Sequence, residues 1–204
     1  MTGAPGAGPA AIARYVAGSV AGAVYLIVDR QAALARFDLS IAGFWRSFGA
    51  ALLVLPVYGL ALAAVGRSLG STGIAGALMI YGLNWVAFPI VMLAVVKLLD
   101  LGEHYVRYII VYNWARVIIA AVQLPLRLVV ANGVLGDAAF VVIATVVTAA
   151  VQVYQWRIAR IALQAGWGAA VGIVVLDLVL GDLIAAAGLA LLGSELPAAP
   201  GLSQ

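Results

Sequence analysis

Five long stretches of hydrophobic residues run along the chain, and short polar segments separate them. They cover residues 47–65, 74–96, 105–131, 138–156 and 165–192. Each stretch is close to the roughly 20 predominantly apolar residues that an α-helix needs to cross a bilayer. The pattern predicts an all-α fold, a polytopic transmembrane helical bundle of five spans within residues 37–193.

The segment before the first stretch is apolar over a shorter length. Residues 15–28 are hydrophobic, which is short for a span, but apolar residues recur at helical spacing through 11–36. We therefore expect an amphipathic helix that lies in the membrane interface. A sixth span is one alternative. A signal peptide cleaved near Ala33-Leu34-Ala35 is another, although Asp29 and Arg30 interrupt the approach to that site.

The composition is typical of a chain that is solvated by lipid. Of the 204 residues, 66% are hydrophobic and 9% are charged, and the mean hydropathy is +1.14. A soluble domain is about half apolar and about a quarter charged. A lipid bilayer is therefore the partner that the sequence requires. The two ends, residues 1–10 and 194–204, are rich in Gly, Ala and Pro, so we expect both to be disordered tails.

The sequence offers little for catalysis. It has no cysteine, which excludes disulfides, cysteine-bound zinc and thiol nucleophiles. Its one histidine, His104, supplies at most one imidazole ligand. No nucleotide-binding, hydrolase or zincin motif occurs. We expect no enzymatic activity, no metal and no cofactor, and the net charge of +3 is too small and too dispersed for nucleic-acid binding.

Positive residues are unequally divided between the two sides of the membrane that five spans would separate. Two lie on the side away from the N-terminus, Arg67 and Arg127. The eight on the N-terminal side are Arg14, Arg30, Arg36, Arg46, Lys97, Arg107, Arg157 and Arg160. The positive-inside rule then predicts a cytoplasmic N-terminus and, with five spans, a C-terminus on the opposite side.

Arginines interrupt the third hydrophobic stretch. If its helix enters the membrane at Arg107, Arg116 lies about 13 Å deeper, and if Arg116 marks the interface, Arg127 is buried instead. A central arginine costs about 2.5 to 3.5 kcal/mol on insertion scales, so we expect it to have a partner. Asp177 lies about 15 Å from Trp167, which begins the fifth span, and so has a similar depth. We predict an intramembrane ion pair between Arg116 and Asp177.

Three further polar residues could support this pair. Asn113, on the neighbouring turn, is expected to add a hydrogen bond. Asp182 is about 140° around the helix from Asp177, so the two do not converge like a catalytic dyad, and we expect Asp182 near the outer interface together with Arg127. The alternative is that Arg116 extends along its stem to the headgroups while Asp177 binds nearby hydroxyls or backbone.

A second polar group precedes the third span. Asp100, Glu103, His104 and Arg107 share one helical face at the predicted cytoplasmic mouth. We expect a solvated cap with local ion pairs. A proton relay or a cation site is the alternative use of these side chains.

Three runs of the sequence and the layout of its spans resemble known membrane proteins. Small uncharacterised inner-membrane proteins of bacteria have runs that look like FDLSIAGFWRSFGAALLVLP at 37–56 and like YNWARVI and YQWRIARIAL of this sequence. The layout of spans over 37–192 resembles the Yip1-like architecture. This resemblance implies a polytopic helical membrane protein without established catalysis. The motif D-L-Y-G-P is missing from the sequence, so Rab binding and vesicle trafficking are not expected.

Two functions remain open from the sequence. The first is a non-enzymatic accessory or membrane-organising subunit of a bacterial inner membrane, with a periplasmic C-terminus and with a membrane protein or a second copy as partner. Small residues such as Gly166, Gly168 and Gly172 would then pack against neighbouring helices. The alternative is a small transporter or channel component that binds an anionic ligand near Arg116.

Overall fold

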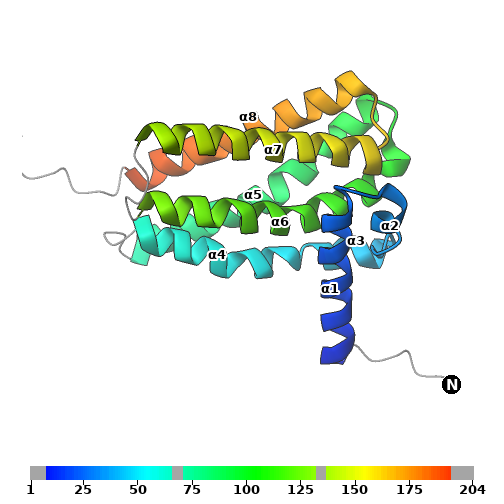
Figure 1. The fold of residues 1–204 in the computed structure, drawn as a ribbon, viewed down its shortest axis with the longest axis horizontal. Coiled ribbons are helices and arrows are strands. Elements are labelled where there is room, and N and C mark those ends of the chain that lie inside the picture. The colour runs from blue at the N-terminus through cyan, green and yellow to red at the C-terminus, as the bar shows by residue number, and fades with distance from the viewer. Residues whose placement is uncertain (1–7, 66–70, 132–136, 194–204) are drawn as a thin grey trace, which may run out of the picture.

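The computed structural model describes residues 8–65, 71–131 and 137–193, and these form helices joined by short turns (Figure 1). The helices are α1 (Pro9–Tyr25), α2 (Arg30–Leu34), α3 (Ile41–Ser47), α4 (Ala50–Val65), α5 (Ser71–Leu98), the 3-10 turn η1 (Gly102–His104), α6 (Tyr105–Ala131), α7 (Asp137–Ala162) and α8 (Trp167–Gly193). Within the described ranges, five helical segments are long and apolar enough to cross a membrane: Ile41–Leu60, Gly73–Leu98, Gly102–Gln123, Ala138–Ala162 and Trp167–Gly188. The prediction of an all-α bundle with five spans and an N-terminal helix is confirmed.

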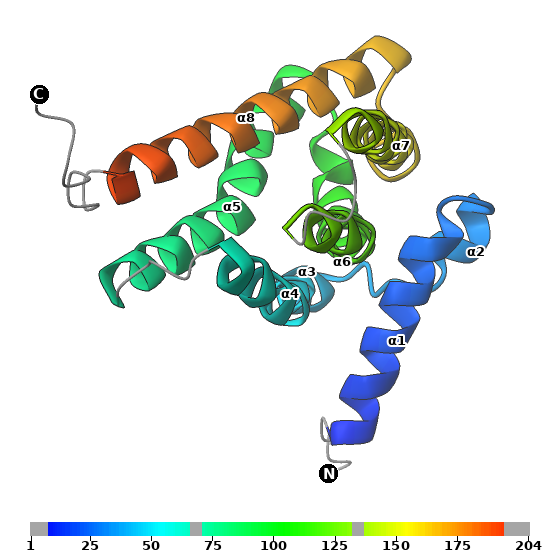
Figure 2. The same ribbon diagram turned by 60° about the vertical axis from the view of Figure 1, so that its left-hand side comes forward.

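The membrane helices are arranged around a common centre (Figure 2). Helix α6 packs against α4 and α7, and α8 packs against α5 and α7. Two tyrosines join α4 to α5: the Tyr58 hydroxyl donates to the Ala77 carbonyl at 3.1 Å, and the Tyr81 hydroxyl donates to the Ala51 carbonyl at 2.6 Å. Each hydroxyl thus meets the backbone of the other helix, as a polar group that is shielded from water requires.

The first span begins earlier than predicted. It starts at Ile41, and α3 gives way to α4 at Phe48 and Gly49. Ser40 sets the start, because its hydroxyl accepts a hydrogen bond from the Gly43 N–H at 3.0 Å and so caps the first turn. Hydropathy placed the start later, at Ser47, because Arg46 interrupts the apolar run.

The N-terminal region contains two helices where one continuous helix over 11–36 was expected. Asp29 separates them: its carboxylate accepts hydrogen bonds from the N–H groups of Gln31 at 2.8 Å and Ala32 at 3.1 Å, and so caps α2. Helix α1 runs across the direction of the bundle (Figures 1 and 2). That orientation is typical of an interfacial helix, and the interfacial position of α1 stays a prediction.

The core is centred on the first half of α6. Residues 108–115 are each at most 5% exposed. Helix α1 covers this part of α6, where the Tyr15 and Trp114 rings meet edge to face with their centroids 5.5 Å apart. The Tyr154 hydroxyl of α7 donates to the Ala23 carbonyl of α1 at 2.7 Å. Helix α1 is therefore bound to the bundle by aromatic packing and by a buried hydrogen bond.

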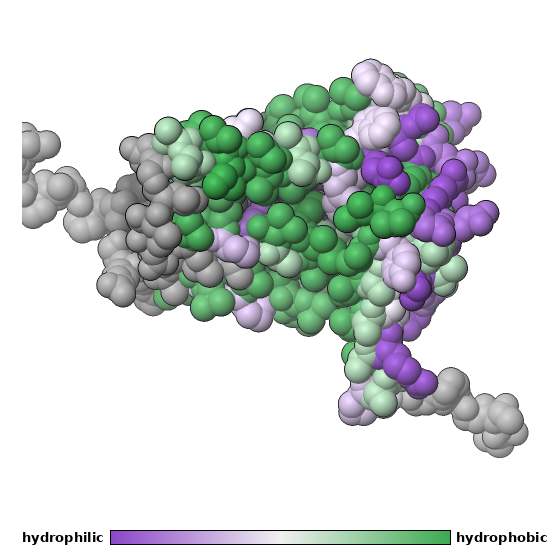
Figure 3. All heavy atoms as spheres, in the orientation of Figure 1, coloured by the Kyte–Doolittle hydropathy of each residue, from purple (hydrophilic) through white to green (hydrophobic). Residues whose placement is uncertain are grey.

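Hydrophilic side chains gather at the end of the bundle that carries α2, and apolar side chains cover the long side seen in Figure 3. Two chain reversals at this end contain a residue with positive φ, Asp100 at 54° and Gln164 at 59°. Asp100 lies two residues after the end of α5. The Leu101 N–H donates back to the Val96 carbonyl at 2.8 Å, which is a common way to satisfy a carbonyl in the last turn of a helix. This is the end that the charge count places in the cytoplasm, and the orientation stays a prediction.

The glycines in and just before α8 differ from expectation. A Cβ added at Gly166, Gly168 or Gly172 would have no neighbour within 4 Å, so these residues do not pack against another helix of this chain. The close approach is at Gly188, where a Cβ would lie 3.2 Å from the Ile80 side chain of α5. The expected small-residue contact therefore lies near the other end of α8.

Candidate functional site

A cavity of about 400 Å³ lies inside the bundle, and all five membrane helices line it. Arg116 and Asp177 are both part of its wall. They follow the first residues of α6 and α8 by eleven and ten positions, which is about 15 Å along each helix from the same end of the bundle. This depth is near the middle of a ~30 Å hydrocarbon core. The polar residues that line the cavity are Tyr58, Tyr81, Asn84, Tyr112, Arg116, Gln123, Gln152, Gln155, Asp177 and Asp182.

Helix α5 holds the Arg116 guanidinium in place. Its Nη1 donates to the Asn84 carbonyl at 2.8 Å, and its Cζ lies 4.1 Å from the centroid of the Trp85 ring. The same stretch of α5 contains Pro89, which has no N–H to donate to the Trp85 carbonyl and interrupts the regular helical bonding. A backbone acceptor and an aromatic face thus fix the cation.

The remaining nitrogens of Arg116 are open. Among the described residues, Nε and Nη2 have no hydrogen-bond acceptor, and neither belongs to the buried polar atoms that lack a partner. Because Arg116 lines the cavity, we infer that these two nitrogens are accessible from it. They form one edge of the planar guanidinium, the edge that matches the two oxygens of a carboxylate or phosphate.

Asp177 is bound by a tyrosine. The Tyr112 hydroxyl donates to Asp177 Oδ1 at 2.6 Å, and the Gln155 side chain of α7 interacts with the same carboxyl group. The Arg116 Cζ lies 5.8 Å from the centroid of the Tyr112 ring. Tyr112 therefore contacts both residues of the predicted pair, and it joins α6 to α8.

The direct ion pair between Arg116 and Asp177 is not formed. In the part of the chain that the structure describes, the ion pairs within 4.0 Å are Arg46 with Asp38 and His104 with Glu103. The predicted depth brings both residues to one cavity. Their charges are instead satisfied separately, since Arg116 binds the backbone of α5 and Asp177 binds Tyr112.

The supporting residues have different positions. Asn113 is fully buried and points to α3, where its Nδ2 donates to the Ser47 hydroxyl at 2.9 Å, so it adds nothing to the Arg116 site. Asp182 lines the same cavity as Asp177 despite the angle between them, and it is exposed. The side chain of Arg127 lies outside the described residues.

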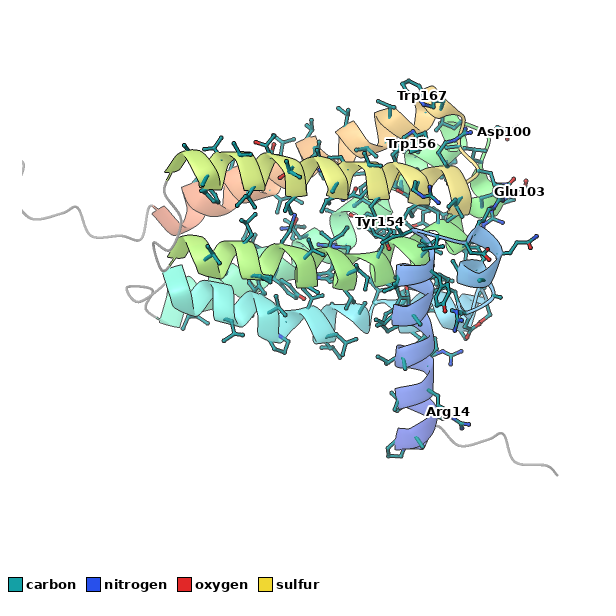
Figure 4. The ribbon with its side chains drawn as sticks, viewed as in Figure 1. Arg14, Asp100, Glu103, Tyr154, Trp156 and Trp167 are labelled. Carbon is teal, nitrogen blue, oxygen red and sulfur yellow. The ribbon has the colours of Figure 1, made fainter. Side chains whose placement is uncertain are left out.

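The predicted cytoplasmic mouth is a set of local contacts. His104 Nε2 and Glu103 Oε1 are 3.4 Å apart, and the Arg107 Nε donates to the Ala162 carbonyl at the end of α7. Asp100 and Glu103 project from the charged end of the bundle (Figure 4). Across the described ranges, no group of three or more His, Cys, Asp or Glu residues is arranged to hold a metal ion. The geometry agrees with the solvated cap that the sequence suggests.

Several cavity residues were not predicted from the sequence. On α6 they are Tyr112, Ile119, Ala120 and Gln123, which share a face with Arg116 at positions i−4, i+3, i+4 and i+7. This spacing could have identified them, because the residues that share a helical face with a buried charge are its nearest candidates for contact. On α7 they include Gln152 and Gln155, which are three residues apart and so also share a helical face.

The fold and the cavity together define the class of this chain, a polytopic helical membrane protein with a polar site inside its bundle. No protein-family model, curated protein or solved structure matches the chain. The resemblance to Yip1-like proteins therefore stays a prediction.

Proposed function

We propose that this chain is a small transporter or channel component that binds a polar solute in the central cavity. One observation carries the proposal: the guanidinium of Arg116, about 15 Å along its membrane-spanning helix, lines a cavity of about 400 Å³, and two of its nitrogens have no acceptor among the described residues. Intramembrane ionisable residues that face a bundle interior commonly mark the path of a substrate or ion. Sites between the helices of a bundle are also a frequent place for small ligands.

The polar groups around the cavity favour a ligand over a purely structural lock. A lock is most stable when its charges and amides satisfy one another, because an unpaired polar group in a dry site costs free energy. Among the described residues, the Arg116 and Asp177 charges are not paired with each other, and Nε and Nη2 of Arg116 have no acceptor. A bound polar molecule or water would supply the missing partners.

The first experiment tests whether the cavity is wet. Because the chain has no cysteine, single cysteines can be introduced without background. Ala120 lines the cavity, and Val122, two residues along the same helix, is 49% exposed on the surface of the bundle. Ala120→Cys and Val122→Cys are reconstituted in lipid vesicles and treated with a water-soluble methanethiosulfonate reagent.

The expected result is faster labelling of Ala120→Cys, by about tenfold or more, because the reactive thiolate forms only where water reaches the sulfur. The two positions differ in depth by only about 3 Å, so depth does not explain such a difference. Equal, slow labelling of both variants would mean that the cavity is dry, and the proposed function would be wrong.

A second candidate function is the accessory or organising subunit of a bacterial inner membrane. It is favoured by an open apolar groove of about 390 Å³ between α7 and α8, which is lined mainly by Val153, Trp156, Trp167, Val171 and Val175. Such a groove suits an apolar helix of another membrane protein. Co-purification of one stoichiometric partner that is lost on Val171→Trp would support this function, whereas an unchanged, partner-free monomer would argue against it.

The proposed orientation has the charged end in the cytoplasm and the C-terminus in the periplasm. Its support is the concentration of Lys and Arg on the N-terminal side. Fusion of alkaline phosphatase to the C-terminus tests it, because this enzyme is active only where its disulfides form, outside the cytoplasm. An inactive fusion that is expressed and inserted would reverse the orientation.

A further inference from the structure

We infer that the solute of the central cavity is a small zwitterion of the amino-acid class, whose carboxylate binds Arg116 and whose ammonium group faces Asp177 and Asp182. This inference rests on the proposed function and adds the chemistry of the ligand. It also revises the purely anionic ligand that the sequence suggested. The inference is supported by the arrangement of charge around the cavity, by the geometry of the guanidinium and by the size of the cavity.

The guanidinium side of the cavity is prepared for a carboxylate. The bond from Nη1 to the Asn84 carbonyl and the contact with the Trp85 ring fix the plane of the Arg116 group. The edge formed by Nε and Nη2 is left accessible, and this edge binds both oxygens of a carboxylate at once. Because the group is already oriented, binding loses little side-chain entropy.

The balance of charge argues against a simple anion. Among the described residues, the charged side chains that line the cavity are Arg116 and two aspartates, Asp177 and Asp182, both from α8. When all three are ionised, this described lining is net negative, so an anion alone would meet repulsion from α8. A cation alone would leave the open edge of Arg116 without a partner. A zwitterion satisfies both sides, and its two paired charges reduce the cost of leaving water.

The size and the apolar part of the wall suit a small molecule with an apolar side chain. A volume of about 400 Å³ is near the lower end of the range for small-molecule pockets. Apolar surface is supplied by Val54, Phe88, Ile119 and Ile184, from four different helices. Polar groups that fix orientation within an otherwise apolar pocket are typical of small-ligand sites.

The test uses the full chain in lipid nanodiscs and compares three related probes by calorimetry. L-leucine carries both charges, L-leucinamide lacks the carboxylate, and 4-methylpentanoate lacks the ammonium group. The corresponding forms of alanine and phenylalanine are measured too, so that the size of the side chain is covered. We expect a zwitterion to bind, and each singly charged analogue to bind about 10- to 100-fold more weakly, because each loses a charge-assisted contact.

Two variants locate the binding in the cavity. Arg116→Gln and Asp182→Asn should each weaken binding of the zwitterion by about tenfold or more while the thermal unfolding of the protein is retained. Asp182 is exposed, so Asp182→Asn is expected to fold even if Arg116→Gln does not. Arg14→Gln, at an exposed arginine of α1, is the matched control and should bind like the parent protein.

Other results overturn the inference in distinguishable ways. Equal or tighter binding of an amide would define a cation site, and equal or tighter binding of a des-amino acid would define an anion site. If no probe binds but Ala120→Cys is labelled from water, the zwitterion is wrong and the proposed solute cavity stands. If Ala120→Cys is also unreactive, the proposed function itself is wrong.

Discussion

The two halves of α6 meet the rest of the protein in different ways. Residues 108–115 are each at most 5% exposed, and α1, α3 and α7 pack against α6; of these residues, Tyr112 also lines the cavity. Asn113, the polar side chain at the centre of this half, donates its amide to Ser47. From Arg116 onward the helix is less buried, and Arg116, Ile119, Ala120 and Gln123 line the cavity.

Under the proposed function, this difference lets one membrane helix serve both stability and binding. The first half resembles the core of a globular protein, where close packing makes every lost methylene group costly. The second half is less closely packed, and Arg116 lines the cavity that is proposed to hold a ligand. Substitutions in the two halves should therefore separate effects on stability from effects on binding.

The largest expected effect is on the packed half. Trp114 is 1% exposed and contacts Tyr15 of α1, so Trp114→Ala should lower the free energy of unfolding by about 3 to 5 kcal/mol. Trp167→Ala is the matched control, because Trp167 is 67% exposed and should lose little. Unfolding of both variants in the same detergent measures the difference, and similar losses would contradict the packing described for α6.

A somewhat smaller effect is expected where α3 begins beside this packed half. A Cβ at Gly43 would overlap the backbone oxygen of Asp38, so Gly43→Ala should displace the start of α3 and cost about 1 to 3 kcal/mol. Gly168→Ala makes the same chemical change in α8, where nothing lies within 4 Å. Thermal unfolding of the two variants tests this, and an equally stable Gly43→Ala would show that the turn relaxes freely.

A modest coupling energy is expected between Tyr112, at the boundary of the two halves, and Asp177 of α8. Tyr112→Phe removes the hydrogen bond to Asp177, and such bonds in membrane proteins contribute about 0.6 kcal/mol on average and at most about 1.7 kcal/mol. A double-mutant cycle of Tyr112→Phe with Asp177→Asn should give a larger coupling energy than one of Arg116→Gln with Asp177→Asn. The reverse order would restore the direct ion pair that the sequence suggested.

The five spans could be predicted because length and hydropathy follow directly from bilayer thickness. Their ends could not, since local bonds decide them. Ser40 begins α3 earlier than hydropathy indicates, and Asp29 divides the N-terminal region in two. The common depth of Arg116 and Asp177 was also accessible from the sequence, because a helix rises by a constant ~1.5 Å per residue.

The contacts within the site could not be predicted from the sequence, because they depend on how each helix is rotated about its own axis. A rotation of α6 directs Asn113 toward α3 and Arg116 toward the cavity, although the two residues are three positions apart. The same rotation brings Tyr112 against Asp177 and leaves the arginine to the backbone of α5. Helix depth is a one-dimensional property, whereas the choice of partner requires the packing of all five helices.

The smallest expected effect is outside the membrane, at Asp38, and it concerns pH. Hydrogen bonding with the Ser40 side chain is the largest cause that lowers the pKa of Asp38, and the nearby Arg46 charge acts in the same direction. A lowered pKa in the folded state contributes stability that is present above the unfolded value of about 4 and is lost as the pH falls through the folded pKa. Asp38→Asn should therefore lose stability at neutral pH, by under about 1 kcal/mol for so exposed a pair, and the loss should vanish in strong acid. Unfolding of parent and variant across the acidic range measures this, and a difference that is constant with pH would mean that the carboxylate charge at the start of α3 has no role.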